Sequence, residues 1–120
     1  MADHNKLGET GEALAKSYLV AKGYEVLETN WKSGHYELDL VMRKDNCVVA
    51  VEVKTRSELV TKASDVMSLK KERTICIAVD RYLSQKQVKT DCRIDLLILE
   101  KKGLGFNVTH IKDAIGQENE

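Results

Sequence analysis

The pattern of apolar and polar residues along the chain predicts two helices and five strands. A helical period covers residues 11–22, with Thr10 as the expected N-cap and Gly23 as the C-terminal stop. A second helical period covers residues 65–84. Strand patterns occupy residues 24–31, 35–43, 47–55, 93–100 and 106–111, and a final helical turn is expected at residues 113–116. The order α-β-β-β-α-β-β predicts an α/β fold in which helices flank a mixed β-sheet.

Alternation within the third strand predicts which side chains share a face of the sheet. Val51 and Val53 point to one side, and Glu52 and Lys54 point to the other. A slip of one residue would drive Glu52 and Lys54 into the core, so burial of the valines fixes the register. The helices are expected to bury these apolar faces: Leu14, Ala15, Tyr18 and Leu19 in the first, and Leu69, Ile75, Ala78, Val79, Tyr82 and Leu83 in the second.

Length and charge restrict the class of protein. A chain of 120 residues is expected to form one domain spanning residues 1–120, with flexible ends at 1–6 and 117–120. The charges of the 19 basic and 19 acidic residues cancel, so the net charge of the chain does not indicate nucleic-acid binding. Residues 55–93 nevertheless hold nine Lys/Arg against five Asp/Glu. This middle segment could contact a phosphate backbone, or it could simply be a solvated helix face.

Other features of the sequence favour a cytoplasmic protein. The first residues contain no apolar stretch typical of a secretory signal, and no apolar run is long enough to span a membrane. Cys47, Cys76 and Cys92 are odd in number and have no paired spacing, which favours reduced thiols. The three histidines are scattered along the chain without a spacing typical of metal ligands.

Two carboxylates are expected to face each other across a β-hairpin. A loop with an even number of residues, centred on Asp45 and Asn46, places Asp39 opposite Glu52. The same register places Glu37 opposite Lys54. Two like charges 4 Å apart repel by about 1 kcal/mol in water and by about 4 kcal/mol at an effective dielectric constant of 20. A divalent cation between the carboxylates would turn this repulsion into attraction.

The hairpin therefore suggests a site for phosphodiester hydrolysis. Asp39 and Glu52 would hold Mg²⁺ or Mn²⁺, with the main-chain carbonyl of Val53 as a third oxygen ligand. Lys54 would orient the attacking water or neutralise charge on the phosphate. Glu12 could complete the site from the first helix, or it could only interact with that helix's dipole. The alternative is that these are cross-strand ion pairs on a solvated face, since the spacing alone is not specific.

Motifs along almost the whole chain narrow this choice. They are Gly8–Glu12, Ala15, Tyr18–Leu19, Gly23–Tyr24, Asn30–Trp31, Glu37–Val41, Val51–Arg56, Lys71, Tyr82–Leu83, Cys92–Asp95 and His110–Ala114. In these motifs the chain resembles the YraN-like family of bacterial proteins, which is similar to archaeal Holliday-junction resolvases and belongs to the PD-(D/E)xK nuclease superfamily. The resemblance implies a restriction-endonuclease-like core.

The resemblance also implies roles for individual residues. Asp39, Glu52 and Lys54 take the places of the superfamily's catalytic trio, and Glu12 matches the glutamate that resolvases add from their first helix. Two departures stand out: Leu38 replaces the superfamily's proline, and Tyr36 replaces a common glycine. Resolvases act as dimers because a four-way junction must be cut twice symmetrically, so the resemblance also implies a homodimer.

Three functions follow as hypotheses. The leading one is a Mg²⁺- or Mn²⁺-dependent nuclease that selects branched DNA. The second is a nucleic-acid-binding protein that keeps the fold without turnover, and the third is an interaction module that binds no nucleic acid. Under the first two, we expect four basic residues to contact DNA phosphates: Arg56, Lys70, Lys71 and Arg73.

Overall fold

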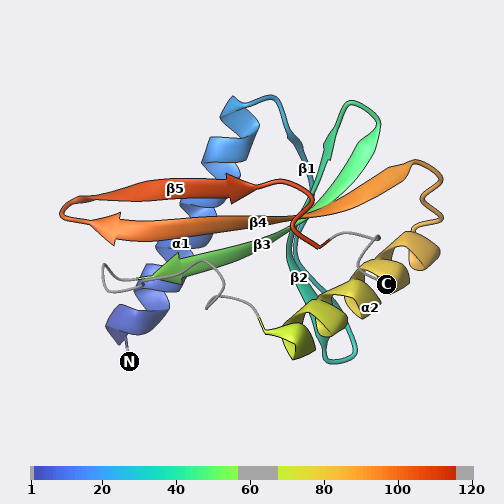
Figure 1. Ribbon diagram of the computed structural model, residues 1–120, viewed down its shortest axis with the longest axis horizontal. Helices are drawn as coiled ribbons and strands as arrows, with labels where there is room; N and C mark the ends of the chain where they lie inside the picture. Colours follow the sequence, from blue (N-terminus) through green and yellow to red (C-terminus); the bar gives the residue numbers. More distant parts are fainter. Residues whose placement is uncertain (1, 57–67, 116–120) are drawn as a thin grey trace.

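The computed structural model describes residues 2–56 and 68–115, with side chains in the first helix described from residue 10 onward (Figure 1). The observed elements are α1 (Ala2–Ala21), β1 (Glu25–Ser33), β2 (Tyr36–Lys44), β3 (Cys47–Arg56), α2 (Leu69–Gln85), β4 (Asp91–Lys102) and β5 (Gly105–Ile111). Their order confirms the predicted α-β-β-β-α-β-β arrangement. In the described ranges, neither helix is long and apolar enough to cross a bilayer.

The five strands form one mixed sheet in the order β1-β2-β3-β4-β5. β3 and β4 are parallel and are connected through α2, while the other neighbouring strands are antiparallel. The β2–β3 turn is formed by Asp45 and Asn46, whose φ angles are 52° and 64°. Two successive left-handed residues are typical of a type I′ hairpin turn, which asparagine and aspartate tolerate well. The predicted even-numbered loop is therefore confirmed, and it fixes the hairpin register.

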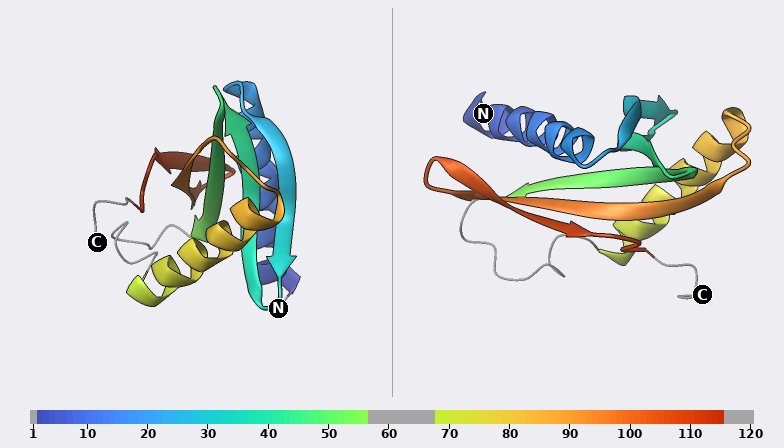
Figure 2. Two further views of the ribbon diagram at one scale, coloured as in Figure 1. Left: turned by 90° about the vertical axis from the view of Figure 1, so that its right-hand side faces the viewer. Right: turned by 90° about the horizontal axis from the view of Figure 1, so that it is seen from above.

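The two helices cover opposite faces of the sheet (Figure 2). Ala15 and Leu19 of α1 are fully buried against the face that carries Val51 and Leu97. The opposite face packs against α2 through Ile75 and its neighbours Ala78, Val79 and Tyr82. Residues 94–99 of β4 are all buried, as predicted for a strand covered on both sides.

The first helix begins at Ala2 and not near Gly11, so the N-cap prediction for Thr10 is wrong. A glycine normally weakens a helix, but Gly11 has a packing role here. A Cβ atom at Gly11 would overlap the side-chain oxygen of Thr55 on β3. The glycine thus lets α1 approach β3 closely, which outweighs the cap signal in the local sequence.

The second helix begins at Leu69 with Ser68 as its N-cap, and the Ser68 hydroxyl accepts a hydrogen bond from the Lys71 amide at 3.2 Å. Its predicted start at residue 65 lies outside the described residues. Leu69 is 70% exposed, contrary to its predicted place on the apolar face. The first buried residue of α2 is Ile75, followed by Ala78, Val79 and Tyr82.

The predicted helical turn at residues 113–116 is wrong as far as it lies within the described residues. Asp113 has a φ of 53°, which is incompatible with a right-handed helix. The Asp113 amide donates to the Asp95 carboxylate at 2.9 Å, and the Ala114 amide donates to the Ile94 carbonyl at 2.8 Å. These bonds to β4 replace the helical hydrogen bonds.

Candidate functional site

The candidate site lies where β2 and β3 separate. Their backbone pairing ends at Leu40 and Val51, and the two strands then diverge (Figure 1). Asp39 is the next residue on β2, and its Oδ2 atom accepts a hydrogen bond of 2.9 Å from the Val53 amide. A side chain therefore takes the place of the next main-chain bond and holds Asp39 beside Glu52.

The ladder's early end also corrects one expectation. Glu37 was predicted to lie opposite Lys54, but the β2–β3 pairing stops before it reaches either residue. Glu37 is instead aligned with Lys32 across the β1–β2 pair. Lys54 is left to interact with a residue of its own strand.

Glu52 is a buried carboxylate with two cationic neighbours. It is only 5% exposed, and its Oε2 atom lies 3.3 Å from the Lys54 ammonium and 3.5 Å from the Lys71 ammonium. Lys54 follows two residues later on β3, whereas Lys71 reaches Glu52 from the first turn of α2. A buried charge needs such partners, because removing it from water without them costs several kcal/mol.

The carboxyl group of Asp39 has a strongly shifted pKa. Its carboxyl pKa is raised from its ordinary value of 3.8 to about 7, mainly by burial and then by the charge of Glu52. The Val53 hydrogen bond lowers the pKa, the charge of Glu12 raises it, and the charge of Lys71 lowers it. The positive charge of Lys71 therefore offsets only part of the effect of burial and of the neighbouring carboxylates.

The charge of Glu12, on α1, also acts on Asp39. Because α1 begins at Ala2, Glu12 lies in the interior of the helix, beyond the first turn where a helix dipole acts on a side chain. The dipole explanation therefore fails, and the charge of Glu12 acts on Asp39. Glu12 also lines a small cleft of about 200 Å³. The other residues of this cleft are Ala13, Lys16, Thr29, Asn30 and Leu40.

The four residues predicted to contact phosphate do not have equivalent environments. Lys70 and Arg73 are exposed on α2. Lys71, between them, is partly buried and forms the ion pair with Glu52, a role that the sequence analysis missed. Arg56 lies at the end of β3, and its guanidinium donates to the Thr55 carbonyl at 3.1 Å.

The oxygen ligands at this site suit a hard divalent cation. Among the described residues, no three or more His, Cys, Asp or Glu side chains are grouped so as to hold a metal ion. Magnesium, however, is commonly bound through one or two carboxylates, with water and substrate phosphate completing its coordination. Asp39 and Glu52 with the Val53 carbonyl fit that smaller set.

A second polar cluster was not recognised from the sequence. Asp95 is completely buried, and it accepts hydrogen bonds from Arg93 at 2.9 and 3.2 Å and from the Asp113 amide at 2.9 Å. His110 Nε2 lies 2.7 Å from the same carboxylate. Arg93 also donates to the Tyr24 hydroxyl at 2.7 Å. This cluster joins β4, β5 and the segment that follows α1.

Fold and site together define an α/β protein with a five-stranded mixed sheet and a carboxylate–lysine cluster where two strands diverge, consistent with a nuclease-like core. The chain belongs to the family described as Uncharacterised protein family UPF0102, whose profile matches residues 11–99. This membership confirms the family resemblance seen in the sequence motifs. The matched range contains Glu12, Asp39, Glu52, Lys54 and Lys71 of the candidate site.

Curated relatives cover nearly the whole chain. A UPF0102 protein of Parabacteroides distasonis is 44% identical over 115 residues, which are 95% of each chain. A UPF0102 protein of Bacteroides thetaiotaomicron is 39% identical with the same coverage. The UPF0102 protein FP2501 of Flavobacterium psychrophilum is 36% identical over 95% of this chain and 97% of its own. Their names give the family and no activity.

Proposed function

We propose that this chain is a cytoplasmic, divalent-cation-dependent nuclease that hydrolyses DNA phosphodiester bonds and selects branched DNA. The observation that carries the proposal is the meeting of Asp39 and Glu52 where β2 and β3 diverge. The pKa of Asp39 is raised to about 7 there, mainly because the carboxylate is partly buried and then because the charges of Glu52 and Glu12 act on it. This arrangement lowers the stability of the fold, and binding of a cation would relieve the repulsion. The sequence motifs shared with the nuclease superfamily support the same reading.

Each side chain has a definite role in this proposal. Asp39, Glu52 and the Val53 carbonyl would hold Mg²⁺ or Mn²⁺, which when bound would polarise the scissile phosphate and lower the pKa of a bound water. Lys54, with its ammonium 3.3 Å from Glu52, would orient the attacking water or neutralise charge developing on the phosphate. Lys71 would add a second positive charge from α2.

The DNA backbone would approach along the first turns of α2. Lys70 and Arg73 are exposed there, next to the residue that pairs with Glu52. Arg56 extends the basic surface from the end of β3. Because the whole chain has no net charge, this local surface has to supply most of the electrostatic affinity.

One observation favours the second hypothesis, a nucleic-acid-binding protein without turnover. Glu52 is 5% exposed and already paired with both Lys54 and Lys71. Such a group could serve as a buried structural ion pair, because a shared fold does not establish activity. In that case the basic residues of α2 would still bind DNA.

Cleavage assays separate the hypotheses. The protein is incubated with linear, flapped and four-way DNA in Mg²⁺ or Mn²⁺, beside Glu52→Gln and a control variant, Glu25→Gln. Glu25 is an exposed carboxylate paired with Arg43 at the far end of the β1–β2 pair. We expect cleavage of branched DNA that Glu52→Gln lowers by about 10²-fold or more and Glu25→Gln leaves intact. Binding without cleavage would favour the silent binder, and neither activity would favour an interaction module.

A further inference from the structure

The two edges of the sheet are protected very differently. β1 contains a register shift between Val26 and Glu28, and it carries Glu25, Glu28 and Lys32 along its length. Bulges and charged side chains are the features by which edge strands avoid pairing with another chain. This edge of the sheet is therefore guarded against further strand addition.

The opposite edge, β5, lacks these features. Its pairing with β4 runs without a shift from Gly105 to Ile111, and residues 105–109 contain neither a charged side chain nor a proline. Within residues 2–56 and 68–115, β5 pairs with β4 alone, so its outer main-chain groups face away from the sheet. A regular, uncharged edge of this kind is a template for another strand.

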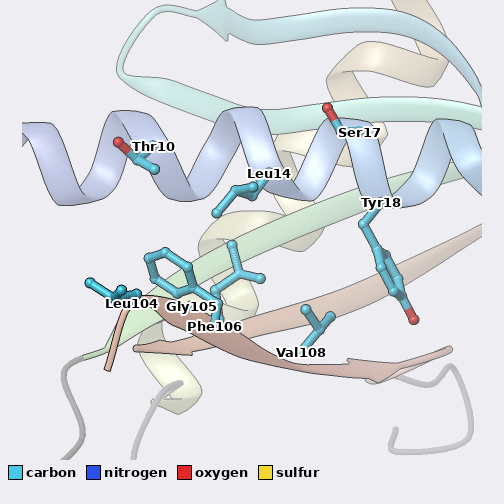
Figure 3. Close-up of a pocket in the computed structure, with 9 residues that line it drawn as sticks. Thr10, Leu14, Ser17, Tyr18, Leu104, Gly105, Phe106 and Val108 are labelled. Atoms are coloured by element: carbon cyan, nitrogen blue, oxygen red, sulfur yellow. The ribbon is translucent and has the colours of Figure 1, made fainter. Parts of the chain in front are cut away.

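An apolar groove lies beside this edge, between α1 and the β4–β5 hairpin (Figure 3). Its volume is about 590 Å³. Leu14 projects into it from α1, and Phe106 and Val108 project into it from β5. Leu14 is 39% exposed and Val108 is 38% exposed, while Thr10 and Ser17 form part of a polar rim. An apolar centre with a polar rim is typical of a protein–protein interface.

We propose that β5 and this groove form the interface of a homodimer in which the β5 strands of two copies pair antiparallel. A two-fold axis near Val108 would place each strand against an identical one, and no charged side chain of residues 105–109 would meet its own copy. Phe106 and Val108 of both copies would then cover the grooves under the two α1 helices. The occupant that fits this edge is thus a second copy of the chain.

The size of the surface shows why both parts are needed. A seven-residue strand is about 23 Å long, and a sheet edge about 10 Å thick therefore offers about 230 Å². A stable interface buries about 800 Å² on each partner. The strand edge alone falls short, so the side chains of the groove have to be covered as well. This inference does not depend on nuclease activity.

The test is the molar mass of the full chain, measured by light scattering during size exclusion and by sedimentation equilibrium. The wild type is expected at about 27 kDa, twice the chain mass of 13.5 kDa. Val108→Lys would place two ammonium groups together at the axis and should raise the dimer Kd by about 100-fold or more. The matched control is Val26→Lys on β1, where the valine is 37% exposed, and it should remain dimeric.

Circular dichroism establishes whether each variant is folded. If Val108→Lys does not fold, Leu14→Lys on the helical wall of the groove replaces it and should also give a monomer. A monomeric wild type would overturn the proposal. So would a dimer that survives both groove substitutions, or one that Val26→Lys disrupts equally.

Discussion

The ammonium group of Lys71, in the first turn of α2, lies 3.5 Å from the buried carboxylate of Glu52 on β3. The two residues lie on opposite sides of the β3–α2 connection. Their contact means that the position of α2 against the sheet determines the charge balance of the candidate site. Lys71 also acts on Asp39, whose pKa it lowers.

Replacing Lys71 should therefore have two opposite effects. In Lys71→Met, loss of a positive charge beside both carboxylates should tighten divalent-cation binding by about fivefold or more. Cleavage should fall by about 10²-fold, because the same charge stabilises the reacting phosphate. Calorimetry and single-turnover cleavage measure the two effects. Lys102→Met, at an exposed position at the end of β4, is the control and should change each by less than about threefold. If Lys71→Met instead weakens cation binding and cleavage together, the role of Lys71 is purely structural.

The raised pKa of Asp39 predicts how stability depends on pH without divalent cations. Between pH 3.8 and about 7 the folded protein binds more protons at this group than the unfolded chain does. The contribution of Asp39 to the free energy of unfolding therefore falls as pH rises through this range, by at most about 1.4 kcal/mol per pH unit. Above about pH 7 it changes no further.

Urea unfolding in EDTA at several pH values measures this effect. In Asp39→Asn the side chain at position 39 no longer titrates. The free energy of unfolding of this variant, relative to that of the wild type, should therefore increase from pH 5 to pH 8. Asp45→Asn, in the exposed turn of the same hairpin, should follow the wild type. Parallel curves for the wild type and Asp39→Asn would show that the Asp39 carboxyl is not perturbed.

The Asp95 cluster makes a prediction about stability alone. Asp95→Ala leaves Arg93 and His110 without their shared buried acceptor, and it should lower the free energy of unfolding by about 3–5 kcal/mol. Asp91→Ala, an exposed carboxylate at the start of the same strand, should change it by less than about 0.5 kcal/mol. Denaturant unfolding measures both. A loss below about 1 kcal/mol at Asp95 would contradict the structural role of the cluster.

The basic surface of α2 predicts the salt dependence of DNA binding. If Lys70 and Arg73 each contact a phosphate, replacing both with alanine should reduce the slope of log K against log salt concentration by about 1.8. The control replaces Lys101 and Lys102, at the β4–β5 hairpin, with alanine. This double variant loses the same two positive charges and should keep the wild-type slope. Fluorescence anisotropy at several salt concentrations gives both slopes. Equal slopes in the two variants would remove α2 from the DNA interface.

Much of the fold and the central pair of the site followed from local sequence signals. Asp45 and Asn46 accept left-handed backbone angles, so the turn and the register of the hairpin could be predicted. That register brought Asp39 beside Glu52. The divergence of β2 and β3 after Leu40 could not be foreseen, because strand twist and helix packing decide where a ladder ends.

The errors came from contacts between distant parts of the chain. Thr10 has the chemistry of an N-cap, but packing of Gly11 against Thr55 favours a longer helix. In the sequence, Lys71 cannot be distinguished from its basic neighbours. Only the folded position of α2, between β3 and β4 in the chain, places it beside Glu52. The buried partners of Asp95 also lie far away in sequence. A carboxylate inside an apolar strand was the available signal, because a buried charge requires partners.

The most direct test of the account is a Mg²⁺ titration of the ¹⁵N-labelled protein, followed through its backbone amide signals. We predict saturable shifts centred on Asp39, Glu52 and Val53, which Asp39→Asn abolishes and Glu25→Gln preserves. The apparent Kd for Mg²⁺ should fall as pH rises through 7, because a proton and the cation compete for Asp39. If these signals do not shift, or if Asp39→Asn shifts as the wild type does, the two carboxylates do not form a cation site.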